Sequence, residues 1–270
     1  MSHDKTGKKN LRIILLLAFF LFACSAFLYV LYLGRPSRGA DIPREAYSGR
    51  QIRILKISGV NNVRDIGGWT TTDGKRVRYG LIIRGGELDG IHSTHITAKG
   101  IKQLKSESIK TEVDLRGSSE VANADYPIKG FAEYNRYSIA SYMGVKENKA
   151  LYKEALSKII TSVLEDKPVY VHCWGGADRT GTVIALLEGA LGVTKDQVIQ
   201  DYELTSYSPI GERRYGKGTD GKKFKELILY IENGFEGDTF EEKCTNLLTD
   251  LGIDIKDIEA FRAKMLEQAA

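Results

Sequence analysis

The sequence predicts an α/β domain in which helices cover a central sheet, with an N-terminal transmembrane helix ahead of it. From residue 51 on, short β-rich apolar runs alternate with longer segments whose apolar residues recur at helical spacing, which is typical of such a domain. Residues 13–33 form a separate stretch without a charged residue. We therefore divide the chain into a short basic segment (1–12), a transmembrane anchor or signal segment (13–33), a linker (34–50) and one folded domain with a helical C-terminal part (51–270).

Strands are expected where β-branched and other apolar residues form short runs. Residues 52–57 alternate apolar and polar side chains, and residues 168–171 form a continuous apolar run that predicts a buried strand. The expected strands cover residues 52–57, 81–84, 111–115, 133–139 and 168–171.

Helices are expected where apolar residues recur every three or four positions. Thr97 is a suitable N-cap for a helix over residues 97–106, and residues 150–164 are strongly amphipathic. Residues 180–191 are almost entirely apolar, which predicts a central buried helix. The remaining expected helices cover residues 197–205, 222–233, 239–251 and 255–268.

The N-terminal apolar segment, Ile13–Leu33, contains 21 uncharged residues. A helix of this length can cross about 30 Å of hydrocarbon. The basic residues before it favour an N-inside orientation, which places the folded domain outside the cytoplasm, whereas Arg35 and Arg38 on the far side count against it. Two alternatives remain: a cleaved signal peptide of a secreted protein, or a lipoprotein signal with Cys24 as the lipidated residue.

The composition limits the class of function. The chain has 42% hydrophobic and 27% charged residues, as a globular enzyme does. A net charge of +4 weakly favours anionic ligands and gives no reason to expect nucleic acid as a partner. The three cysteines give no disulfide framework. Cys244 is expected to be a small apolar residue on a helix face.

The run HCWGGADRTG, from His172 to Gly181, lies between a predicted buried strand and a predicted apolar helix. A tight loop that leads into a helix N-terminus aims backbone N–H groups and the positive end of the helix dipole at one point, which suits a phosphate ester. Arg179 is expected to return to the same phosphate with two parallel hydrogen bonds. The expected phosphate-binding residues are Trp174, Gly175, Gly176, Ala177, Asp178 and Arg179.

The same loop predicts a nucleophile. A helix N-terminus and a nearby cation favour the thiolate form of a cysteine, so Cys173 is expected to attack phosphorus and form a cysteinyl-phosphate. Thr180 is placed to donate its hydroxyl to the departing sulfur. His172 is expected to orient the loop, because its side chain should point away from that of Cys173. The competing interpretation is a buried cysteine beside a helix-capping loop.

This run resembles the phosphate-binding loop of the protein tyrosine phosphatase superfamily. Three other stretches are similar to its bacterial tyrosine, dual-specificity and lipid phosphatase branch: Asn62–Gly68, Tyr79–Leu88, and Val113–Arg116 together with Glu120. The resemblance implies a mostly parallel central sheet with helices on both sides and a reaction that needs neither a metal ion nor an organic cofactor. Close members of the branch carry Lys where this chain has Ala177, which weakens the expectation of a phosphoinositide substrate.

The leaving group needs a proton donor. The superfamily often places an Asp on the loop before the nucleophile, but residues 137–145 contain no Asp or Glu. The resemblance to the bacterial branch implies Asp178 as the acid; the other interpretation of Asp178 is a helix N-cap. Asp114 is the alternative acid, or a structural partner of Arg84 or Arg116. Asn62, Arg64 and Asp65 are expected to brace the loop.

Three functions follow as hypotheses. The first is a hydrolase of phosphotyrosine or of mixed phosphoprotein substrates, with the membrane as a partner through the N-terminal helix. The second is a phosphoinositide or inositol-phosphate phosphatase, which the membrane tether and a basic cluster favour. This basic cluster consists of Arg213, Arg214, Lys217, Lys222, Lys223 and Lys225. The third is an inactive phosphate-binding module, against which the intact Cys173, Arg179 and Thr180 argue.

Overall fold

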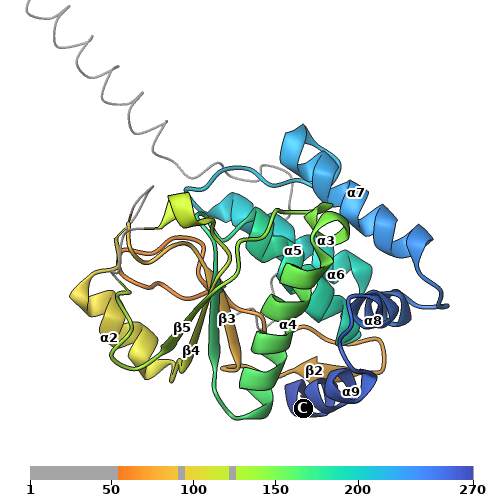
Figure 1. Ribbon diagram of the computed structural model, residues 1–270, viewed down its shortest axis with the longest axis horizontal. Helices are drawn as coiled ribbons and strands as arrows, with labels where there is room; N and C mark the ends of the chain where they lie inside the picture. The colour runs from red at the N-terminus through yellow and green to blue at the C-terminus, as the bar shows by residue number, and fades with distance from the viewer. Residues whose placement is uncertain (1–53, 91–94, 122–125, 270) are drawn as a thin grey trace, which may run out of the picture.

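A five-stranded sheet forms the centre of the molecule (Figure 1). The computed structural model describes residues 54–90, 95–121 and 126–269. Across the sheet the strand order is β1 (Arg64–Asp65), β3 (Ile82–Gly85), β6 (Val169–His172), β4 (Thr111–Asp114) and β5 (Glu133–Arg136). β1 is antiparallel to β3, and the other pairings are parallel. The expected mostly parallel sheet is therefore confirmed.

Helices cover both faces of this sheet, as the resemblance implied. α2 (Ala98–Ser106) lies on one face, while α4 (Lys149–Leu164) and α5 (Asp178–Ala190) lie on the other (Figure 1). Side chains alternate along the strands accordingly. Ile83 and Tyr170 belong to the core on the α2 side, whereas Ile82 and Val171 belong to the larger core on the side of α4 and α5.

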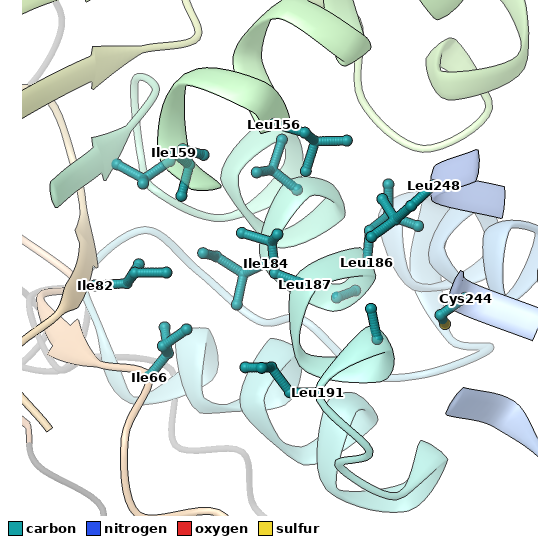
Figure 2. Packing of buried hydrophobic residues seen from close by; sticks show 14 of the residues in the cluster. Ile66, Ile82, Leu156, Ile159, Ile184, Leu186, Leu187, Leu191, Cys244 and Leu248 are labelled. Carbon is teal, nitrogen blue, oxygen red and sulfur yellow. The ribbon is translucent and has the colours of Figure 1, made fainter. Parts of the chain in front are cut away.

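α5 is the central buried helix that its apolar sequence predicts. In Figure 2 its residues Ile184 and Leu187 lie between the sheet and α4, while Leu186 faces α8 (Phe240–Asp250). Cys244 of α8 is fully buried, as expected of a small apolar residue on a helix face. A Cβ at Gly189 of α5 would lie 2.3 Å from its Sγ atom, so these two helices pack at close range.

The other helices are α3 (Gly144–Glu147), α6 (Lys195–Glu203), α7 (Gly218–Gly234) and α9 (Ile255–Met265), together with the short 3₁₀ helices η2 (Ser118–Glu120) and η3 (Leu204–Tyr207). Thr97 caps α2, since its side chain accepts a hydrogen bond from the amide of Gly100. The expected helices within the described residues are all present, with ends shifted by a few residues.

Two expectations about local structure are wrong. No strand forms over the described part of residues 52–57: Ile54 makes one bridge to Arg64, and the chain then turns at Gly59, which has φ of +81°. The helix expected over residues 255–268 stops at Met265, and β7 (Leu266–Gln268) instead pairs antiparallel with β2 (Lys75–Val77). The spacing of apolar residues within 255–268 could not reveal this pairing, because β2 lies far away in the sequence.

The predicted segments over residues 1–12, 13–33 and 34–50, including the transmembrane helix, lie outside the described residues. Within residues 54–90, 95–121 and 126–269, no helix is long and apolar enough to cross a membrane.

Candidate active site

The candidate phosphate-binding loop connects the end of β6 to the start of α5, so the centre of the sheet supports it. Cys173 follows β6 directly and is buried, and Trp174 is 47% exposed. The N-cap position of α5 is Ala177, and Asp178 is the first residue of the helix. The loop residues therefore gather around a helix N-terminus, where the dipole favours an anion.

Hydrogen-bond donors from outside the loop bind its carbonyl groups. The carbonyl of Trp174 accepts a hydrogen bond of 2.9 Å from the amide of Glu87. The carbonyls of Gly175 and Gly176 accept bonds of 3.0 and 3.1 Å from Nδ2 of Asn62. In a trans peptide the N–H points opposite to the preceding C=O. The amides of residues 175–177 therefore turn to the inside of the loop, where a phosphate needs donors.

Gly176 requires its glycine for two reasons. Its φ is +64°, in the left-handed region that other residues rarely adopt. A Cβ at this position would lie 2.2 Å from the carbonyl oxygen of Gly85 in β3. The loop therefore packs directly against the sheet backbone at Gly176.

A buried ionic network under the loop holds it in place. Asp201 of α6 accepts hydrogen bonds from Nε of Arg64, at 2.8 Å, and from Nη1 of Arg84. Arg84 also donates from Nη2 to the carbonyl of Gly176 at 2.8 Å. Burial and the charge of Arg64 lower the pKa of Arg84 to about 10, against the opposing effect of Asp201. Arg84 therefore remains a cation at neutral pH and ties the loop to the sheet and to α6.

Arg179 pairs with a carboxylate at the edge of the loop. Its Nη1 and Nη2 atoms donate to Glu120 of η2 at 2.5 and 2.8 Å. Burial lowers the pKa of Arg179, but Glu120 and the charge of Cys173 outweigh burial and raise it. A guanidinium group has five N–H donors, so the pair leaves Nε–H and further N–H groups for a phosphate. Glu120 thus fixes the direction of the candidate clamp.

Asp178, the candidate acid, has partners from two other segments. Nε and Nη2 of Arg213 donate to its two carboxylate oxygens at 2.7 and 2.9 Å. The hydroxyl of Tyr142 also donates to Oδ1. These contacts place Asp178 beside the loop and engage both of its oxygens.

Asp114, the alternative acid, pairs with Arg116, one of its two expected structural partners. It is fully buried and accepts hydrogen bonds from Nη2 of Arg116 at 2.8 Å and from the hydroxyl of Tyr134 at 2.9 Å. Burial raises the pKa of Asp114, but His172 and Arg116 outweigh burial and lower it to about 2. Asp114 is therefore ionised and has a structural role.

The supporting residues differ in their distance from the loop. His172 is buried with Nε2 3.0 Å from a carboxylate oxygen of Glu112, away from the nucleophile. Burial lowers the pKa of His172, but Asp114 and Glu112 outweigh it and raise the pKa. Thr180 is buried, and its hydroxyl has no hydrogen-bond partner within the part of the chain that the structure describes.

Of the three residues expected to brace the loop, Asn62 contacts it directly and Arg64 acts through Asp201. Asp65 instead accepts hydrogen bonds from the amides of Gly67 and Gly80, so it stabilises the neighbouring turns.

Sequence reasoning missed four partners of the site. Glu120 pairs with Arg179, and the buried pair of Arg84 and Asp201 lies under the loop. Tyr142 contacts Asp178 from residues 137–145, the segment without an Asp or Glu. The charged end of the apolar strand Leu81–Arg84 was a usable signal, because a buried Arg requires an anionic partner.

The residues of the basic cluster lie in two different environments in the structure. Arg213 is engaged by Asp178, and the buried Arg214 lies 3.8 Å from Glu212. The lysines at 217, 222, 223 and 225 are exposed at the N-terminal part of α7 and just before it. The two arginines of the cluster thus have acidic partners, whereas its four lysines are exposed.

The chain is similar to known phosphatases. It is 40% identical over 50 residues to the triple specificity protein phosphatase PtpB of Mycobacterium tuberculosis, a match that covers 18% of each chain. It is 24% identical over 172 residues, 55% of this chain and 61% of the other, to a Cupriavidus necator protein with the name "putative tyrosine-protein phosphatase". The chain therefore spans less than two thirds of the length of either relative.

Two solved structures are also similar. P. aeruginosa TpbA matches with a TM-score of 0.45 and 13% identity, over 76% of this chain and 99% of that one. The PP-IP phosphatase SIW14 from S. cerevisiae matches with a TM-score of 0.37 and 13% identity, over 58% and 92%. The model of the tyrosine phosphatase family matches residues 55–267, which include the loop and all its partners described above. The chain belongs to the tyrosine phosphatase family.

Proposed function

We propose that this protein hydrolyses phosphate monoesters with Cys173 as the nucleophile. The observation that carries this proposal is the loop itself. Its carbonyls are bound from outside by Asn62, Arg84 and the amide of Glu87, so that its amides face inward around a buried cysteine at a helix N-terminus. Such an arrangement binds a phosphate dianion and stabilises a thiolate in the same place.

In the proposed reaction, the Cys173 thiolate attacks phosphorus as the bond from phosphorus to the leaving oxygen breaks, which forms a cysteinyl-phosphate. Asp178 gives its proton to the leaving oxygen. The guanidinium group of Arg179 and the loop amides stabilise the charge on the phosphoryl oxygens. Water then attacks the cysteinyl-phosphate and gives one proton to Asp178, so that phosphate and the thiolate are released. Thr180 donates a hydrogen bond to the departing sulfur.

For the substrate, we propose phosphotyrosine or a mixed set of phosphoproteins. The tyrosine phosphatase family model and the triple specificity of the M. tuberculosis relative support this choice. Phosphoinositides or inositol phosphates are the second candidate, which the exposed lysines of α7 favour. Pairing of Arg213 with Asp178 removes one cation from that surface and favours the first candidate.

For the location, we propose a membrane anchor over residues 13–33 with the folded domain outside the cytoplasm. The length of the uncharged segment and the basic residues before it support this proposal. Protease added to intact cells should digest the domain of the full-length protein. Protection in intact cells together with digestion after lysis would place the domain inside.

The activity is tested with the full-length protein in detergent. It should hydrolyse p-nitrophenyl phosphate without added metal, and vanadate should inhibit it. Cys173→Ser should lose turnover by a factor of about 10³ or more but still bind the ester, because the phosphate cradle remains. Cys244→Ser is the matched control, since Cys244 lies in α8 away from the loop. Unchanged turnover in Cys173→Ser would overturn the mechanism.

The substrate is tested with a panel of phosphotyrosine peptides, phosphoserine peptides, phosphoinositides and inositol phosphates. The highest kcat/KM should be on phosphotyrosine peptides. A higher value on phosphoinositides would replace the first candidate with the second.

A further inference from the structure

Arg116 lies just after β4 and is buried, with its guanidinium group among three carboxylates. Nε and Nη2 donate to Asp114 at 2.9 and 2.8 Å, and Nη2 also donates to Asp89 at 2.8 Å. Nη1 donates to Asp89 at 2.7 Å, to Glu87 at 2.9 Å and to the backbone carbonyl of Glu120 at 3.2 Å. A guanidinium group has five N–H donors, and these acceptors account for all of them. Arg116 is therefore bound by the protein itself rather than placed to bind a phosphate.

One of these partners, Glu87, reaches the start of the phosphate-binding loop. Its carboxylate accepts the bond from Arg116, and its backbone amide donates to the carbonyl of Trp174 at 2.9 Å. A Cβ at Gly86 would lie 3.1 Å from the same carbonyl oxygen, so this segment packs closely against the loop. Since the peptide is trans, the N–H of Gly175 points opposite to that carbonyl, to the inside of the loop. The position of Glu87 therefore controls the direction of the Gly175 amide.

Another partner, Glu120, reaches the end of the loop. Its carbonyl accepts the bond from Arg116, and its amide donates to the carbonyl of Gly117 at 3.0 Å. Its carboxylate accepts a bond from the amide of Gly117 at 2.8 Å and also binds Nη1 and Nη2 of Arg179. Because Gly117 follows Arg116 in the chain, these two residues together place the carboxylate that directs Arg179.

Neutralisation of buried charge is a simpler role for Arg116, and its contacts with Asp89 and Asp114 fit that role. Burial lowers the pKa of Arg116, but Asp114 and Asp89 outweigh burial and raise it, so the side chain stays a cation. Charge neutralisation does not explain the bond to the backbone carbonyl of Glu120, which carries no net charge. That bond holds the turn from which Glu120 reaches Arg179, so the contacts of Arg116 include one that suits positioning.

We propose that Arg116 is a positioning residue that aligns the amide of Gly175 and the guanidinium group of Arg179 on one phosphate, through Glu87 and Glu120. This inference rests on the proposed function of the loop. Its consequence is that loss of Arg116 weakens the grip on the phosphoryl group whatever the leaving group is, because in the proposed reaction these donors bind the phosphoryl oxygens and Asp178 serves the leaving oxygen.

The experiment uses the full-length protein in detergent, at a temperature where denaturant curves show each variant to be folded. Arg116→Met should lower kcat/KM by about tenfold or more for aryl phosphates with good and with poor leaving groups alike, and the Kd for vanadate should rise by a similar factor. Arg116→Lys keeps the charge, but one ammonium group cannot replace the fork that reaches Glu87 and Glu120 together. This variant should therefore show most of the same loss.

Leu248→Ala is the control for lost stability. Leu248 is fully buried in α8, so its truncation leaves a cavity and destabilises the protein. Because this residue contacts no part of the proposed route, kcat/KM and the Kd for vanadate should stay at their wild-type values. If the Arg116 variants lose activity only in proportion to their unfolded fraction, as Leu248→Ala would, Arg116 is structural alone and the inference is overturned.

A double-mutant cycle tests the route through Glu120. Arg116→Met should lower kcat/KM by a smaller factor in a Glu120→Gln background than in the wild type, because one of the two connections is already broken there. Equal factors in the two backgrounds would overturn the inference.

The outcomes also separate this inference from the proposed function. If Cys173→Ser loses turnover but the folded Arg116 variants keep wild-type kcat/KM and vanadate binding, the positioning role is overturned and the proposed function stands. If Cys173→Ser keeps turnover, the proposed function and the inference that rests on it are both overturned. If Arg116→Met fails to fold, Arg116→Lys carries the decision alone, and an unchanged Kd for vanadate in that variant overturns the inference.

Discussion

Arg84 donates a hydrogen bond of 2.8 Å from Nη2 to the carbonyl oxygen of Gly176, and so joins the central sheet to the phosphate-binding loop. The same guanidinium group pairs with Asp201 of α6. Since the side chain is fully buried, the contact is protected from water and salt. A strand residue thus controls the direction in which a loop peptide points.

Arg84→Met should destabilise the protein by about 3 kcal/mol, because it removes one partner of a buried ion pair. It should also lower kcat/KM by about tenfold or more, since the peptide after Gly176 loses its anchor. Denaturant unfolding and p-nitrophenyl phosphate assays measure the two effects. Lys105→Met, at an exposed position of α2, is the control. A stable variant with wild-type kcat/KM would contradict the role of Arg84.

Gly176→Ala should lower kcat/KM by about a hundredfold, because the new Cβ would lie 2.2 Å from a backbone oxygen and the loop would have to shift. Gly130→Ala is the matched control, since its Cβ would meet no atom within 4 Å. Steady-state kinetics on the two variants provide the comparison. Equal kcat/KM in Gly176→Ala and Gly130→Ala would contradict the need for glycine at position 176.

Asp178→Asn should slow aryl phosphates with poor leaving groups much more than those with good ones, because only the former need a proton in the transition state. The measurement is the dependence of kcat/KM on the acidity of the leaving phenol, which should be steeper in the variant. If both kinds of substrate slow equally, Asp178 has a structural role alone.

Glu120→Gln should lower kcat/KM by about tenfold, because Arg179 loses the carboxylate that directs its guanidinium group. The Kd for vanadate should rise in parallel, since the same clamp binds this phosphate analogue. Glu107→Gln, at the C-cap of α2, is the control. An unchanged Kd for vanadate would show that Arg179 needs no such partner.

Asp114→Asn should lower stability by about 2 kcal/mol at pH 5, since a pKa lowered from 3.8 to about 2 corresponds to this amount. A carboxyl group with a lowered pKa contributes its full stability above pH 4, and that contribution is lost as the pH falls through 2. The difference between wild type and variant should therefore shrink between pH 5 and pH 2.5 in denaturant titrations. A difference that stays constant with pH would contradict the assignment.

Local patterns predicted much of this molecule. The apolar run before Cys173 and the apolar helix after Asp178 correspond to β6 and α5, and the alternation of such runs predicted a sheet covered by helices. These features depend on neighbouring residues along the chain, so periodicity reveals them. Local spacing gave the wrong prediction for β7, because this strand forms by pairing with the distant strand β2.

The loop is a local feature, because a cysteine, glycines that allow its path and an arginine six residues later follow one another along the chain. The residues that surround the loop depend on how distant segments fold together. Glu120, Tyr142, Asp201 and Arg213 come from four separate segments, and each contacts its partner because buried polar and charged groups need partners where the chain folds back on itself. Nothing in the spacing of these residues records that requirement, since the distances that matter are those across the fold.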